Sequence, residues 1–189
     1  MSRAYRIKVS ESLNKVIRAE DHVKTELELL NILPSDQMGE LLAGALEKDG
    51  FEREGDVLKK VDGDVTVTVD VKTGEVTVQA SDCEELELKG QGEGRYYDDV
   101  RGSKKQAEKQ ARDELKRTLE DDANAKEEVL QQKMTDQLER KLSDIRQQLD
   151  KAVNKVTAEA LKQKAAQIGQ IKEMTEDPEA GSLTIVVEV

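Results

Sequence analysis

The sequence has very few aromatic residues for its length. Among its 189 residues there are three tyrosines, one phenylalanine and no tryptophan. A globular domain of this size normally buries more large side chains than that. The shortage leaves either disorder or a coiled coil, and the helical periodicity described below favours the coiled coil.

A single histidine and a single cysteine restrict the chemistry further. With His22 alone, no catalytic arrangement that needs a second histidine can form, and Cys83 alone excludes an intrachain disulfide. The two could form a dyad, but His22 lies in an expected turn and Cys83 in an acidic strand, where a thiolate is disfavoured. A zinc site lacks ligands. We therefore expect no catalytic residue, no metal site and no cofactor.

Charge is abundant but not basic. The formal net charge is −11, and residues 1–102 carry 14 basic and 23 acidic side chains against 16 and 14 in residues 103–174. Phosphate binding requires a net basic surface, so we expect no nucleic-acid partner. The longest apolar run, residues 183–187, is far too short for a membrane span, and the N-terminus lacks the apolar core of a signal peptide. These features predict a soluble, cytoplasmic protein.

Alternating apolar residues predict antiparallel strands in the first half of the chain. The alternation is clear in residues 5–9 and again in residues 23–29, and residues 20–22 between them are expected to form a hairpin turn. Residues 65–80 contain two further alternating runs joined by a Lys-Thr-Gly turn.

Helical spacing predicts one short helix and one long one. Residues 36–49 place apolar side chains at i, i+3, i+4 and i+7, with Ser35 as the expected N-cap and Gly50 as the stop. The glycine-rich residues 90–102 are expected to be a hinge. Residues 103–174 follow as a long helical arm that opens on a capping-box spacing.

The arm carries a narrow apolar stripe with an eleven-residue repeat. Its central members are Met134, Leu138, Leu142, Ile145, Leu149, Val153 and Val156. This period predicts a nearly straight or slightly right-handed coiled coil. Because so narrow a stripe must meet another helix, the arm either folds back on itself or pairs with a second chain. Pairing between chains is favoured, and the expected state is a homo-oligomer, with a dimer first.

Two segments are candidates for partner binding. Residues 175–189 are an acidic linker and a β-branched strand, whose apolar residues are Leu183, Ile185, Val187 and Val189. Left unpaired, this strand would be prone to aggregation, so it must join its own sheet, a partner subunit or another protein. Tyr96 and Tyr97 either anchor a partner or pack the hinge on the domain, and packing is favoured.

The expected fold class is α+β. It comprises a small antiparallel β-sheet domain with one short helix (1–89), the glycine-rich hinge (90–102), a long coiled-coil-like arm (103–174) and the acidic linker with a C-terminal β-strand (175–189).

Three stretches of sequence resemble a known group of proteins. SRAYRIKVSES, LELLNILPSDQMGELLAGALEKDGF and GSLTIVVEV are similar to small uncharacterised accessory proteins encoded beside AAA+ ATPases of the FtsH type in bacterial ternary conflict systems. The resemblance implies an accessory component that works with an AAA+ ATPase, and it supplies no catalytic residue. The leading hypothesis is a non-enzymatic adaptor or scaffold that self-associates through its arm. The alternatives are a structural filament-forming protein and an enzyme of unrecognised chemistry.

Overall fold

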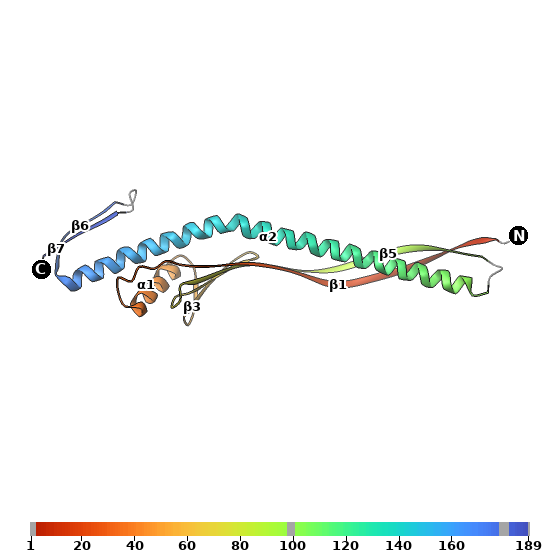
Figure 1. Ribbon diagram of the computed structural model, residues 1–189, viewed down its shortest axis with the longest axis horizontal. Coiled ribbons are helices and arrows are strands. Elements are labelled where there is room, and N and C mark those ends of the chain that lie inside the picture. Colours follow the sequence, from red (N-terminus) through yellow and green to blue (C-terminus); the bar gives the residue numbers. More distant parts are fainter. Residues whose placement is uncertain (1–2, 98–100, 178–181, 189) are drawn as a thin grey trace. The chain divides into compact units, whose positions relative to one another are not determined.

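The computed structural model describes residues 3–97, 101–177 and 182–188. The chain follows the order β1 (Ala4–Glu26), α1 (Ser35–Lys48), β2 (Glu52–Glu54), β3 (Val57–Asp62), β4 (Val65–Asp70), β5 (Glu75–Tyr97), α2 (Ser103–Ile168), β6 (Gln170–Asp177) and β7 (Ser182–Glu188) (Figure 1). One sheet has the order β1-β5-β4-β3-β2, and a second contains β6 and β7. The predicted α+β class, with one short and one long helix, is confirmed.

These elements form two compact units, and neither unit is one continuous segment. The first consists of Met1–Glu20 and Ser81–Thr135, and the second of Asp21–Ala80 and Asp136–Val189. Because β1, β5 and α2 each contribute to both, the units cut across the predicted segments rather than following them.

In the first unit, α2 packs along the ribbon formed by β1 and β5 (Figure 1). Val9 of β1 forms a buried cluster with Ala111, Leu115 and Leu119 of α2. β5 approaches α2 closely at Gly92, where an added Cβ would lie 3.3 Å from the carbonyl oxygen of Ala111. Small residues on both elements therefore allow the two backbones to approach.

The predicted hinge was wrong for residues 90–97, which form the last part of β5. The physical reason is the helix beside them. Gly90, Gly92 and Gly94 alternate along the strand, and a Cβ on any of them would meet atoms of α2 within 3.3 Å. These glycines provide clearance for a neighbour rather than backbone freedom. Residues 98–100 of the expected hinge lie outside the described residues.

In the second unit, α1 lies against β2 and β3, and the sheet has one apolar face. Valines of β4 alternate with threonines, and the register Val67↔Val78 and Val69↔Val76 places the valines of β4 and β5 on one face. α1 comes close to the turn after β4 at Gly39, whose added Cβ would lie 3.1 Å from the carbonyl oxygen of Val71.

The predicted short helix is confirmed almost residue for residue. Met38, Leu42 and Leu46 are buried in it, as the spacing requires. Its N-cap is Pro34, with no side-chain hydrogen bond, so Ser35 is the first helical residue and not the predicted cap. Gly50 follows the helix with a φ of 89°, a left-handed conformation that suits glycine at a C-terminal stop.

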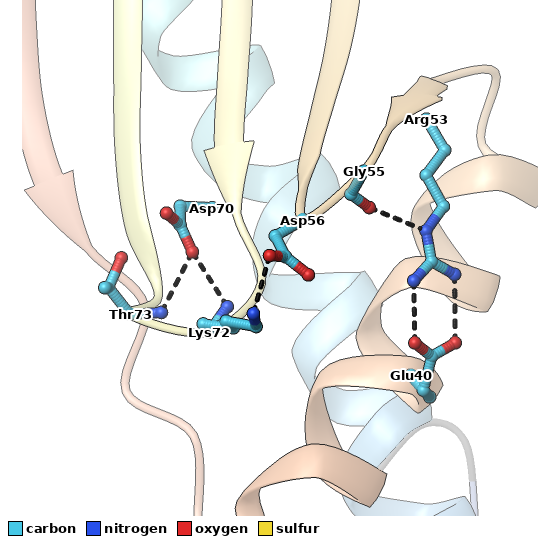
Figure 2. Close-up of polar contacts among 7 residues, drawn as sticks. All are labelled: Glu40, Arg53, Gly55, Asp56, Asp70, Lys72 and Thr73. Carbon is cyan, nitrogen blue, oxygen red and sulfur yellow. Dashed lines mark hydrogen bonds and ion pairs between the residues drawn. The ribbon is translucent and has the colours of Figure 1, made fainter.

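The β4–β5 turn is also as predicted. The carboxylate of Asp70 accepts hydrogen bonds from the backbone N–H groups of Lys72, at 2.8 Å, and Thr73, at 3.1 Å (Figure 2). These two hydrogen bonds, the one from Thr73 more strongly than the one from Lys72, hold the pKa of Asp70 below its usual value. Gly74 completes the turn at a φ of 76°.

The predicted hairpin turn at residues 20–22 was wrong, because β1 runs through it as one strand. The apolar alternation keeps the same odd-numbered phase on both sides of this point, so no reversal is needed. The carboxylate of Asp21 accepts a hydrogen bond from the adjacent backbone N–H of His22, at 2.8 Å, while the strand continues.

An ion pair joins α1 to β2. The guanidinium of Arg53 donates two hydrogen bonds to the carboxylate of Glu40, at 2.6 and 2.9 Å, and a third to the carbonyl oxygen of Gly55, at 3.0 Å (Figure 2). This pairing lowers the pKa of Glu40 and raises that of Arg53. The arrangement orients β2 and is exposed to solvent.

Candidate protein-binding surfaces

The predicted stripe of the arm lies on α2 and divides into two groups. Met134, Leu138, Leu149 and Val156 are no more than 4 % exposed, and they are buried by residues of their own chain. Leu142, Ile145 and Val153 are only half-buried. The first group is thus covered without a second chain, while pairing between chains through the stripe stays a prediction.

Charged side chains also attach α2 to the rest of its own chain. In the first unit, Lys133 pairs with Asp82 at 3.0 Å, and in the second unit Lys155 pairs with Asp49 at 3.2 Å. Lys141 pairs with Asp62 in the same way. The lysine partners lower the pKa values of Asp82 and Asp62. The buried part of the stripe and these three lysines of α2 thus make their contacts within the chain.

The two tyrosines before the arm have different surroundings. The ring of Tyr96 stacks on that of Tyr5, with 5.4 Å between the ring centroids and 22° between their planes. Tyr97 is the next residue along β5 and is 52 % exposed. Since successive side chains of a strand point to opposite faces, Tyr96 packs within its unit and Tyr97 is the one accessible to a partner.

The C-terminal strand pairs with β6, a destination that was not among the three considered from the sequence. The register includes Ile171↔Val187 and Met174↔Ile185, with an irregularity between Ile171 and Glu173. Leu183, Ile185 and Val187 are half-buried on one face of β7, while the residues between them are exposed. Val189, the fourth predicted member, lies outside the described residues.

Gly169 is a sterically constrained position whose role the sequence reasoning missed. It lies between α2 and β6, where an added Cβ would lie only 2.2 Å from the carbonyl oxygen of Glu188. An ion pair between Lys172 and Glu188, at 2.8 Å, lies beside it in the hairpin. The available signal was that Gly169 is the first glycine after sixty-six residues of helix.

The residues considered for catalysis lie at exposed positions. Both His22, on β1, and the thiol-bearing Cys83, on β5, are exposed. Within residues 3–97, 101–177 and 182–188, no group of three or more histidine, cysteine, aspartate or glutamate side chains is arranged to hold a metal ion. No helix in the described part of the chain is long and apolar enough to cross a membrane.

The fold and these surfaces define a small α+β protein in which a long helix is packed on strands of its own chain. The chain matches the family described as FtsH ternary system domain X5 over residues 1–189, and it belongs to this family. The resemblance noted from the sequence is thereby confirmed. No curated protein and no solved structure matches the chain.

Proposed function

We propose that this protein is a non-enzymatic accessory component of an FtsH ternary system and that it binds a companion protein through the β6–β7 hairpin. Membership of the family supports the accessory role. The observation that carries the binding mode is that, among the residues the structure describes, β6 and β7 form a separate sheet of two strands.

A two-stranded hairpin is marginally stable in water on its own. Here it also has an apolar face, because Ile185 and Val187 of β7 are paired with Met174 and Ile171 of β6. Met174 is 48 % exposed and Val186, on the other face, 45 % exposed. A partner that covers the apolar face of the hairpin would stabilise it by removing apolar surface from water.

The hairpin also offers hydrogen-bonding edges. A sheet of two strands has an outer edge on each strand, with backbone N–H and C=O groups that a further strand can pair with. The expected occupant is a strand of a companion protein of the same system, and the FtsH-type ATPase is the first candidate. Both the edge and the apolar face would then contribute to binding.

The test compares two variants of adjacent residues with the same added charge. Ile185→Asp places a carboxylate on the apolar face, whereas Thr184→Asp places it on the exposed face of the same strand. Binding of the full chain to the purified FtsH-type ATPase, measured by biolayer interferometry, should weaken about tenfold or more for Ile185→Asp, because a charge on a covered apolar face is costly. Thr184→Asp should bind as the unaltered chain does. Equal binding by both variants would refute the hairpin as the binding site.

Self-association through the arm stays a prediction, and the burial of Met134 and Leu138 counts against it. Light scattering distinguishes a single chain from a dimer formed through the arm. We expect the mass of one 21.1-kDa chain, since the stripe is already covered. A measured mass of twice this value at micromolar protein concentration would support the predicted dimer.

A further inference from the structure

An apolar groove lies in the second unit, between α2 and the end of β1. Val23 and Leu27 from the β1 side and Val76 from β5 line one side, and Leu142, Ile145 and Val153 of α2 line the other. Its volume is about 320 Å³, which is at the lower end of the range for ligand pockets. The half-buried members of the predicted arm stripe therefore all line this groove, together with the buried Leu149.

The groove runs beside an open sheet edge. β1 is the outermost strand of the five-stranded sheet. The backbone N–H of Leu27 donates to the carbonyl oxygen of Gly74, at 2.8 Å, so the backbone at this odd-numbered position faces the sheet. Because the direction alternates along an antiparallel strand, the N–H and C=O groups of Lys24 and Glu26 point outward. A chain lying in the groove could pair with them.

The margin of the groove is acidic. Glu26, Glu28 and Asp150 line it, with Arg146 as the basic residue among the lining side chains. The unit to which it belongs has 14 basic and 24 acidic side chains in its sequence, whereas the first unit has 16 and 17. A basic segment would therefore be attracted to this unit in particular.

We propose that this groove binds an extended basic peptide segment of another protein. The segment adds a strand to the free edge of β1 and places alternate apolar side chains against Leu142, Ile145 and Val153. Its basic side chains lie near Glu26 and Glu28. The site is additional to the β6–β7 hairpin and does not depend on it.

The test uses a fluorescent peptide, Lys-Val-Lys-Ile-Lys-Val-Lys, and the full chain, with binding followed by fluorescence anisotropy. We expect saturable binding that is lost when glutamate replaces every lysine of the peptide. Two further peptides carry N-methyl groups on alternate residues in opposite phase. Strand addition predicts that one of them fails to bind and that the other still binds, because only every second residue pairs with the edge.

Matched variants locate the site on the protein. Glu26→Gln with Glu28→Gln should weaken binding about tenfold, since two exposed ion pairs are lost. Glu52→Gln with Glu54→Gln makes the same change of net charge on the exposed β2 and should leave binding unaltered. Ile145→Arg should block the groove, whereas Gln147→Arg on an exposed position should not.

Four results would overturn the proposal: no binding of the basic peptide, equal binding of both methylated forms, equal effects of the two glutamine pairs, or tighter binding of the peptide Ser-Leu-Thr-Ile-Val-Val-Glu. The last would assign the groove to the terminal strand of a second copy of this chain. Ile185→Asp should leave the affinity for the basic peptide unchanged, so a failure of the hairpin proposal and a failure of this one are distinguishable.

Discussion

Replacing Gly94 by alanine is the most direct test of the close packing between β5 and α2. The added Cβ would lie 2.9 Å from the carbonyl oxygen of Ala107 and 2.9 Å from Cγ2 of Ile7. The oxygen belongs to the helix backbone, so relieving the contact requires the helix or the strand to move. Overpacking of this kind costs about 1–3 kcal/mol.

An opposing effect acts on the unfolded chain. Gly94 does not have a positive φ, so alanine can adopt its backbone conformation, and the loss of unfolded-state freedom would stabilise by about 0.4–1 kcal/mol. The net expectation for Gly94→Ala is therefore a loss of about 1–2 kcal/mol in the free energy of unfolding. Gly90→Ala should cost less, because its nearest contact, at 2.7 Å, is the flexible end of the Leu115 side chain.

Urea unfolding followed by circular dichroism would measure the loss. Hydrogen exchange at the backbone amides of residues 107–119 would show whether the loss falls on the first unit. Gln91→Ala is the control, since Gln91 is an exposed residue of the same strand, and its effect should stay within about 0.5 kcal/mol. A Gly94→Ala chain as stable as the unaltered one would show that β5 and α2 are not packed this closely.

Three further changes test other parts of the fold. Met134→Ala should lower the free energy of unfolding in urea by about 2–4 kcal/mol, because the side chain of Met134 is fully buried. Val129→Ala, at a position 70 % exposed, should change it by no more than about 0.5 kcal/mol. Equal effects would mean that the stripe is not buried within the chain. The folded-state pKa of Asp70 is lowered, so its contribution is present above the unfolded-state pKa of about 3.9 and is lost as pH falls through the folded-state value. Asp70→Asn should therefore lose less stability than the unaltered chain between pH 7 and pH 3, and unfolding curves that fall in parallel would contradict this. Gly169→Ala should speed hydrogen exchange in β6 and β7, because its Cβ would lie only 2.2 Å from the carbonyl oxygen of Glu188, and unchanged exchange would contradict the junction geometry.

Elements with a clear local period were predictable from the sequence. The stripe of the short helix and the valine alternation of β4 each have one consistent apolar face, and both form as expected. β3 was missed although Gly63-Asp64 between two apolar runs is a hairpin signal. At residues 20–22 the opposite error was made, because a turn was predicted where none exists. The polar residues there interrupt the run of apolar side chains, but the side chains keep alternating between the two faces of β1.

The surroundings of the long helix were less predictable than the helix itself. An apolar stripe shows that a helix is covered on one side, but it does not show whether a helix or a strand covers it. The pairing of β6 with β7 was hidden for a related reason. Residues 170–174 continue the polar composition of the helix, and only contact with a strand later in the chain selects the extended form.

The scarcity of aromatic residues has a structural reason in the first unit. Where Ala107 and Ala111 of α2 face Gly94 and Gly92 of β5, large side chains would separate the two backbones, and small ones let them approach. Apolar surface is then buried by many contacts between small side chains along the helix instead of by a few large side chains. This has a consequence for binding. Alanine and leucine side chains already packed against a strand are not available to a second helix. For this reason the proposed partner sites are the β6–β7 hairpin and the groove beside the edge of β1.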